Sequence, residues 1–211
     1  MSGYKTITAS GEAEFTIQRS RFITHTAPIQ NEAEAQAFLQ QIKKRYYDAR
    51  HSCSAWVLGP DGSRQKSSDD GEPGGTAGAP ILEAIRQNGL TNLIIVVTRY
   101  FGGIKLGAGG LIRAYSHAAV LGSEASPIAQ ATLFRRTAVT IAYPLLGTIE
   151  NWLRQKNIRI ADKRYTENVT LILLIEPEAL EAAAADLTNL TAARCQIDLQ
   201  DEIWLNVPLE K

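Results

Sequence analysis

The segment from Arg99 to Arg113 is the most unusual part of the sequence, because five glycines occur within nine residues, from Gly102 to Gly110. Glycine permits positive φ and lets other groups approach the backbone closely. Amides at the start of a helix point outward and favour anions. The segment therefore predicts an anion-binding loop between a strand and a helix. The alternative is a plain strand-to-helix turn, but one turn needs fewer glycines.

Cations and planar side chains accompany these glycines. Lys105 and Arg113 add positive charge, and the residues from Arg99 to Phe101 add flat surfaces on which bases can stack. The predicted nucleic-acid or anion site comprises Arg99, Tyr100, Phe101, Gly102, Gly103, Lys105, Gly107, Gly109, Gly110 and Arg113. The spacing matches neither a Walker loop nor a GxGxxG fingerprint, because no Gly-Lys-Ser/Thr ending follows.

A second glycine-containing segment runs from residue 68 to residue 78. Its three carboxylates within four residues could hold a hard cation, although a solvated acidic turn is more common. We favour a partner-recognition loop, with a metal loop as the alternative, made of Asp69, Asp70, Glu72, Gly74, Gly75 and Thr76. Both glycine-containing segments flank a helix predicted over residues 79–88, so we expect them to face each other.

Nucleophilic catalysis has only a weak basis in the sequence. His51 and Cys53 lie two residues apart on a predicted strand and so share a face. With Asp69 or Asp70 nearby, they could form a Cys-His-Asp set. A buried thiol and an ordinary histidine explain them better, because a small apolar role is the usual one for cysteine. We therefore predict no catalytic residue and no cofactor, and assign no metal ligands.

The first part of the chain alternates strands and helices. Asn31 with Glu34 three residues later predicts a helix start. The aliphatic run Leu93 to Val97 predicts a strand that is covered on both faces. We expect strands over 4–9, 13–17, 21–29, 51–58, 64–67 and 93–97, and helices over 31–47, 79–88 and 111–122.

The pattern restarts after Ser126-Pro127, which predicts two domains, residues 1–130 and 131–211. The second part predicts a strand around 139–143, a helix from Pro144, a hairpin of 158–165 and 169–175, a helix from Pro177 and a strand over 197–207. This βαββαβ order is the ferredoxin-like pattern. The fold class is therefore α+β.

Composition excludes several classes of protein. The 211 residues carry no net charge, and residues 1–130 hold 13 Lys and Arg against 11 Asp and Glu. Any nucleic-acid contact must therefore be local. The longest aliphatic runs have five residues, too few to span a membrane. Two cysteines without a CxxC motif and a start unlike a secretion signal favour the cytoplasm.

The two glycine-containing motifs resemble the signature of the IMPACT family, in its bacterial, YigZ-type branch. The matching residues are Asp69, Asp70, Glu72, Arg99, Tyr100, Gly102, Gly103, Lys105 and Gly107. The resemblance implies an amino-terminal domain similar to domain IV of elongation factor G, with a left-handed βαβ crossover. It implies a carboxy-terminal domain similar to domain V of that factor.

The resemblance and the residues together predict a non-enzymatic protein that binds RNA or the ribosome and regulates translation. One alternative is a phosphotransferase similar to the GHMP kinases, in which residues 102–110 cradle a nucleotide and the acidic loop, residues 68–78, holds magnesium through Asp69, Asp70 or Glu72. The other alternative is a protein–protein adaptor, which the balanced charge supports. The oligomeric state and the identity of the partner are left open.

Overall fold

The structure is a computed structural model that describes residues 3–209, and the chain divides into two compact units. One unit comprises Gly3–Ala131 together with the chain from Asn206 onward, and the other comprises Thr132–Leu205. The predicted division after residue 130 falls within strand β7 (Ile128–Ile141). None of the helices within residues 3–209 has the length and hydropathy needed to cross a bilayer.

The first unit is built on an antiparallel sheet with the strand order β2-β3-β6-β4-β5. Its elements are β1 (Gly3–Ile7), β2 (Gly11–Ile17), β3 (Ser20–Pro28), α1 (Glu32–Arg45), β4 (His51–Leu58), β5 (Arg64–Ser68), α2 (Gly78–Gln87), β6 (Leu93–Tyr100) and α3 (Gly107–Glu124). Because β3 and β4 are both antiparallel to β6, which lies between them, they are parallel to each other. The segment β3-α1-β4 is therefore a βαβ crossover, the connection that the resemblance to elongation factor G predicts.

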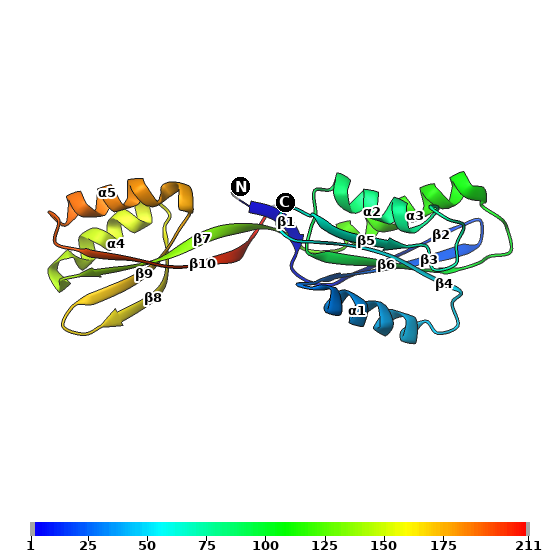
Figure 1. Ribbon diagram of the computed structural model, residues 1–211, viewed down its shortest axis with the longest axis horizontal. Coiled ribbons are helices and arrows are strands. Elements are labelled where there is room, and N and C mark those ends of the chain that lie inside the picture. Colours follow the sequence, from blue (N-terminus) through cyan, green and yellow to red (C-terminus); the bar gives the residue numbers. More distant parts are fainter. Residues whose placement is uncertain (1–2, 210–211) are drawn as a thin grey trace. The chain divides into compact units, whose positions relative to one another are not determined.

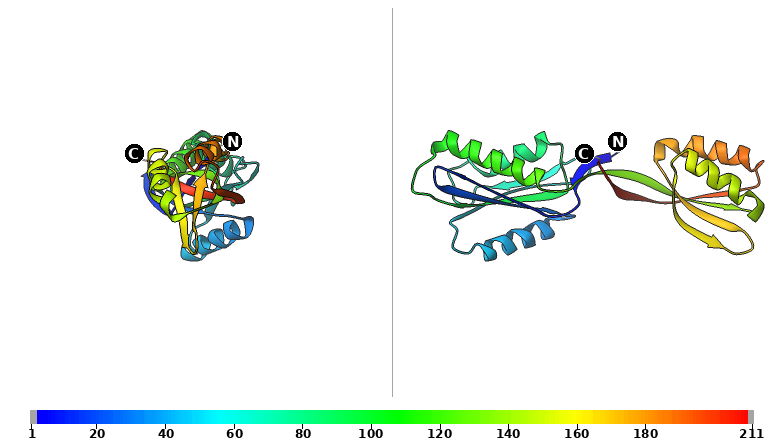
Figure 2. Two further views of the ribbon diagram at one scale, coloured as in Figure 1. Left: turned by 90° about the vertical axis from the view of Figure 1, so that its left-hand side faces the viewer. Right: turned by 180° about the vertical axis from the view of Figure 1, so that it is seen from behind.

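Helices cover both faces of this sheet. Helix α1 lies on one face, and α2 and α3 lie on the other (Figures 1 and 2). Successive residues of β6 point to opposite faces: Ile95 packs in the core beneath α2 and α3, and Ile94 packs in the core beneath α1. The prediction of a strand covered on both faces is confirmed. Each such buried aliphatic side chain contributes about 1.5–3 kcal/mol.

The start of α1 is held by the predicted capping box. Asn31 Oδ1 accepts a hydrogen bond of 2.9 Å from the backbone N–H of Glu34. The carboxylate of Glu34 in turn accepts from the backbone N–H of Gln30 at 2.8 Å. These two bonds satisfy amides that have no acceptor inside the helix, so this helix start was predictable from local sequence.

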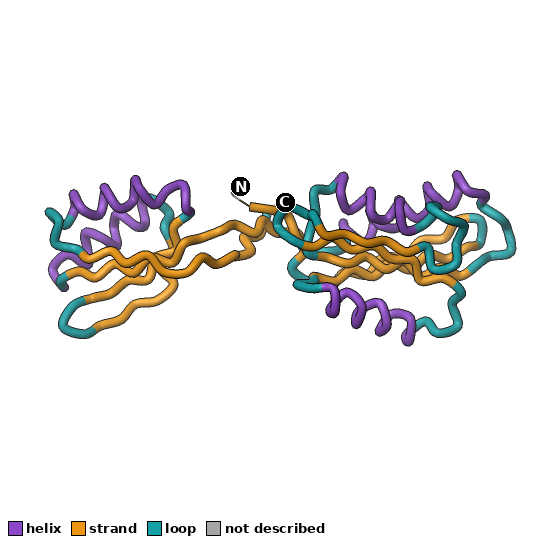
Figure 3. The backbone as a smooth tube through the Cα atoms, viewed as in Figure 1, coloured by secondary structure: helices purple, strands orange, loops and turns teal. Residues whose placement is uncertain are grey.

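The second unit has the ferredoxin-like arrangement. Its elements are β7, a 3-10 turn (Tyr143–Leu145), α4 (Leu146–Gln155), β8 (Arg159–Tyr165), β9 (Val169–Ile175), a 3-10 turn (Pro177–Ala179), α5 (Leu180–Leu190) and β10 (Gln196–Pro208). The strand order is β10-β7-β9-β8, and β1 also pairs with β7. Helices α4 and α5 lie on the same face of the sheet (Figure 3), and Trp152 and Leu187 pack in the core between them and the strands. The predicted βαββαβ order is confirmed.

Strand β7 is much longer than predicted. Its 14 residues begin at Ile128, whereas the sequence predicted a strand only around 139–143. The early part of β7 buries the small residues Ala129 and Ala131, which give no strong strand signal. Pairing with other strands, rather than intrinsic propensity, therefore extends β7.

Candidate functional site

A cavity of about 410 Å³ lies where β6 leaves the sheet, between the two glycine-containing segments. Its walls include parts of the acidic loop, of the β6–α3 connection and of the first turn of α3. The lining residues are Arg50, His51, Glu72, Pro73, Arg99, Phe101, Lys105, Leu106, Gly107, Ala108 and Leu111. The structure thus brings Glu72 of one predicted loop into the same cavity as Arg99, Phe101, Lys105 and Gly107 of the other.

A buried ion pair forms the floor of this cavity. Arg99 and Glu72 are only 6% and 8% exposed, and Arg99 Nη1 donates to Glu72 Oε1 at 2.7 Å. Arg99 Nη2 also donates to Ser20 Oγ at 3.3 Å, and the guanidinium lies 5.5 Å from the ring centroids of both Phe22 and Phe101. Arg99 is therefore fixed inside the protein, so it is not an exposed platform for bases.

The ion pair continues into a buried hydrogen-bond chain. Tyr115 donates its hydroxyl to Glu72 Oε1 at 2.8 Å, and Cys53 Sγ lies 3.4 Å from that hydroxyl. The Cys53 thiol also donates to the backbone oxygen of Asp69 at 2.9 Å. Burial raises the pKa of Cys53 to about 12. Because the thiolate is the nucleophilic form, the Cys-His-Asp alternative lacks an activated nucleophile.

Helix α3 begins four residues earlier than the sequence predicted. We expected a loop up to Gly110, but Gly107, Gly109 and Gly110 lie in the first turn of the helix. Glycine weakens a helix by about 1 kcal/mol per residue. The burial of Leu111 and Tyr115 against the sheet outweighs that loss, because tertiary packing supplies most helical stability in proteins.

The N-terminus of α3 offers unbonded amides to the cavity. Among residues 3–209, no side chain caps this helix, and the first amides of any α-helix lack an acceptor within it. Gly107, at φ +70°, and Ala108 line the cavity. A positive φ is a conformation that glycine adopts without strain. The 18-residue helix therefore directs N–H donors and the positive end of its dipole toward the cavity.

Two cations at the cavity have no internal partner. Lys105 and Arg50 are exposed and line it, and neither forms an ion pair with any residue between 3 and 209. Arg113 lies outside the lining, but one of its nitrogens lies near Gly109, 3.9 Å from where a Cβ would stand. Phe101 is 52% exposed. The mouth of the cavity is therefore positively charged and carries one exposed aromatic ring.

Two other residues of the predicted site have structural contacts instead. Tyr100 follows Arg99 on β6 and so points to the opposite face. Its hydroxyl donates to Asp48 Oδ1 at 2.6 Å, and this bond raises the pKa of Tyr100 to about 12. A Cβ at Gly102 would lie 2.0 Å from the backbone carbon of Arg19, so glycine permits a close approach there. Neither Tyr100 nor Gly102 lines the cavity, and Gly103 does not line it either.

Asp69 caps helix α2. Its carboxylate accepts backbone N–H bonds from Gly75 at 2.9 Å, Ala77 at 3.0 Å and Gly78 at 2.8 Å. Burial disfavours the charged form, but these three bonds outweigh it and hold the pKa of Asp69 below its ordinary value. The start of α2 is thus satisfied from within the protein, in contrast to the start of α3.

The other residues of the acidic loop also have internal partners. Asp70 accepts from Lys43 Nζ at 2.6 Å and from the backbone N–H of Ser52 at 2.7 Å, and Thr76 Oγ1 donates to Pro73 O at 2.7 Å. Gly74 has open space around it. The three carboxylates therefore bind three separate sets of partners. Over residues 3–209, no group of three or more His, Cys, Asp or Glu side chains is placed to hold a metal ion.

The sequence did not point to Arg50, Pro73, Leu106, Ala108 or Leu111 as lining residues. From the sequence, we considered His51 only as a catalytic residue. The strand register explains why they meet: β4 pairs with β6 so that His51 lies opposite Arg99. This places the start of β4 at the end of β6, and no local pattern reports such a pairing.

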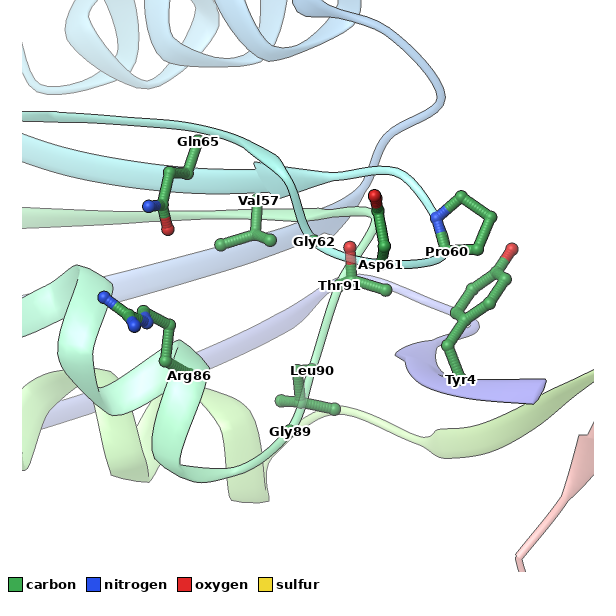
Figure 4. A pocket seen from close by; sticks show the side chains of 10 residues that line it. All are labelled: Tyr4, Val57, Pro60, Asp61, Gly62, Gln65, Arg86, Gly89, Leu90 and Thr91. Atoms are coloured by element: carbon green, nitrogen blue, oxygen red, sulfur yellow. The ribbon is translucent and has the colours of Figure 1, made fainter. Parts of the chain in front are cut away.

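A second cavity, of about 310 Å³, lies at the other end of the sheet. It is formed by the β4–β5 turn, the end of α2 and the beginning of the chain, and Figure 4 shows Arg86 of α2 and Tyr4 of β1 on its walls. It contains none of the residues that the motifs predicted. We therefore place the candidate site at the cavity beside α3.

Comparisons with known proteins match both parts of the chain. The family profile described as the Impact N-terminal domain matches residues 18–121, and a domain of unknown function, DUF1949, matches residues 139–194. The chain is similar to IMPACT family member YvyE of Bacillus subtilis, with 42% identity over 93% of this chain and 91% of that protein. It is also similar to IMPACT family member YigZ of Escherichia coli, with 37% identity over 86% and 90% of the two chains. A solved structure titled as that of a hypothetical protein has 32% identity, a TM-score of 0.62 and covers 95% of this chain and 98% of its own.

The buried ion pair predicts a strong asymmetry between single and double substitutions. Arg99→Met leaves Glu72 charged and unpaired, and should lower the free energy of unfolding by about 3–5 kcal/mol. Arg99→Met with Glu72→Gln should be less destabilising than the two single changes added together. Urea unfolding of the single and double variants measures these changes in the free energy of unfolding. Arg21→Met, at the exposed pair with Glu14, is the matched control and should have little effect. An equally small effect at Arg99 would contradict a buried pair.

Asp69 predicts a pH-dependent contribution to stability. Because its folded pKa is lower than its unfolded value, the carboxylate stabilises the protein above the ordinary pKa of about 3.9. That contribution is lost as the pH falls through the lower folded value. Asp69→Asn should therefore be less stable at neutral pH, and its stability should fall less on acidification. Thermal unfolding across this pH range provides the measurement, with Glu83→Gln on the exposed side of α2 as control. Parallel pH profiles for Asp69→Asn and the parent would refute the capping role.

Proposed function

The chain belongs to the IMPACT family, and from this premise we propose that it is a non-enzymatic RNA-binding protein that acts on translation. The observation that carries the proposal is the start of α3, which no side chain of residues 3–209 caps and which lines a cavity beside two cations without an ion-pair partner among those residues. The RNA phosphate binds at this helix start. Association with ribosomes follows from binding RNA and needs no separate protein surface.

The contrast between α2 and α3 supports an anionic ligand. Both helices pack on the same face of the sheet. Asp69 satisfies the amides at the start of α2, whereas the start of α3 has no side-chain cap in the part of the chain that the structure describes. Amides and the helix dipole at such a start favour negative charge. Lys105 and Arg50 add to this attraction. A phosphate oxygen is the ligand that completes the α3 terminus.

The lining of the cavity also suits a nucleobase. Phe101 offers an exposed ring, and Pro73 and Leu106 add apolar surface beside it. A base stacked on an aromatic side chain contributes about 1–3 kcal/mol and is tolerant of sequence. A cavity of about 410 Å³ falls in the range of small-molecule pockets, roughly 300–1,000 Å³. It can take a nucleotide of a single strand, whereas a duplex is too wide.

The balanced charge of the protein indicates that it contacts only a few phosphates of a bound RNA. With no net charge over 211 residues, the chain cannot neutralise a long run of backbone. Each phosphate neutralised adds about 0.7 to the salt slope for a single strand. We therefore expect a shallow salt dependence, which reflects one or two contacts at the cavity.

The geometry supports binding better than phosphoryl transfer. A phosphotransferase needs acidic side chains that converge on the metal beside the transferred phosphate. Here the Asp69 carboxylate caps α2, and Asp70 pairs with Lys43. Glu72 pairs with Arg99. Three carboxylates with separate partners do not make one ligand set.

Reversing the charge at the α3 start should weaken RNA binding. We expect Lys105→Glu with Arg113→Glu to bind a single-stranded oligoribonucleotide at least about tenfold more weakly in a filter assay, and to show a smaller salt slope. The matched control is Lys44→Glu with Arg64→Glu, an equal charge change at exposed residues outside the cavity.

Each outcome of this experiment separates the candidate functions. Unchanged RNA binding by a folded Lys105→Glu and Arg113→Glu protein would overturn the proposed site. Loss of binding in both double variants would show a general charge effect. A thermal shift with ATP and magnesium, without any RNA binding, would favour the phosphotransferase alternative. Absence of both would favour the adaptor.

A further inference from the structure

The floor of the cavity holds a hydrogen-bond acceptor without a partner. Glu72 is 8% exposed, and both Arg99 and Tyr115 donate to the same oxygen, Oε1. The other oxygen, Oε2, accepts from no residue between 3 and 209. It is also not among the atoms of these residues that are both sealed from solvent and unbonded. Glu72 lines the cavity, and Oε2 is the carboxylate oxygen that its internal partners leave available.

The carboxylate of Glu72 is suited to a ligand that donates a hydrogen bond. The charge of Arg99 balances that of Glu72, so the floor does not repel an anion bound nearby. Arg99 and Tyr115 also fix the carboxylate, which lowers the loss of side-chain freedom on binding. Oε2 is not sealed from solvent, so a ligand that displaces water there must supply its own O–H or N–H donor.

His51 provides a second acceptor at the cavity. Its Nδ1 lies 2.9 Å from the backbone oxygen of Asp70. A carbonyl oxygen can only accept, so Nδ1 is the nitrogen that carries the proton whenever the ring is neutral, and Nε2 is then an acceptor. No residue between 3 and 209 bonds to Nε2. His51 lines the same cavity as Glu72.

The cavity thus has acceptors at its floor and positive charge at its mouth. A matching ligand carries hydrogen-bond donors and an anionic group that fit together within one cavity of about 410 Å³. A ribonucleotide has this pattern, because its 2′-hydroxyl donates and its phosphate is negative. A deoxyribonucleotide has the phosphate but lacks the donor.

We propose that the cavity binds one nucleotide of an RNA strand, with its 2′-hydroxyl donating to Glu72 Oε2 and its phosphate at the start of α3. Glu72 is then the residue that selects RNA over DNA. This inference rests on the proposed RNA binding and adds the chemical class of nucleic acid and the atom that recognises it.

The test compares three single-stranded oligonucleotides of one sequence by fluorescence anisotropy. They are RNA, 2′-fluoro RNA, which removes the donor with little added bulk, and DNA. A hydrogen bond to a charged group corresponds to about a tenfold change in affinity. We expect the unaltered protein to bind RNA about tenfold more tightly than either of the other two strands.

The variant Glu72→Gln provides a second, independent test of the inference. The amide keeps an oxygen for Arg99 and Tyr115 but puts an N–H₂ donor in place of Oε2. RNA and 2′-fluoro RNA should then bind within about twofold of each other. Circular dichroism checks the fold of this variant. If Glu72→Gln does not fold, the comparison of the three oligonucleotides with the unaltered protein is by itself the test of the inference.

The outcomes distinguish this inference from the proposed function. Equal binding of all three strands by the unaltered protein overturns selection by the 2′-hydroxyl but leaves phosphate binding intact. A folded Glu72→Gln protein that still prefers RNA to 2′-fluoro RNA by about tenfold removes Glu72 from that role. Failure to bind any strand overturns both the inference and the proposed function.

Discussion

The buried ion pair between Arg99 and Glu72 is the interaction on which the rest of the site depends. It joins the end of β6 to the loop that precedes α2, and Tyr115 of α3 bonds to the same carboxylate oxygen. Three elements that are far apart in the chain are thereby held around one cavity. Two charges in such a dry environment are stable only as a pair with further hydrogen bonds. This requirement fixes the positions of β6, α2 and α3 relative to one another at this end of the sheet.

The same arrangement separates the structural carboxylates from the one that faces the cavity. Asp69 completes the start of α2, and Asp70 bonds to Lys43 and to the backbone of β4. Glu72 alone of the three lines the cavity. The acidic loop is therefore mainly structural. It presents a single oriented carboxylate to the cavity that the start of α3 also lines. Because these polar groups are fixed, they favour one orientation of a ligand. They therefore contribute more to specificity than to affinity.

The two units divide the chain between a site and a ferredoxin-like domain. The first unit holds the cavity and both glycine-containing motifs. The second unit buries a separate core around Trp152 and Leu187. A fold of this second kind hosts many unrelated functions. The side chains that converge on the candidate site lie in the first unit.

The sequence by itself determined the order of helices and strands, the two glycine-containing motifs and the family. These are local signals: the capping box at Asn31 and the aliphatic run of β6 each lie within one short window. Only the tertiary structure decided that Arg99 is buried, that Asp69 caps α2 and that α3 starts at Gly107. It also decided that Arg50 and His51 join the cavity. Each of these depends on contacts between distant segments, such as the register that places His51 opposite Arg99, and periodicity within one segment carries no information about that pairing.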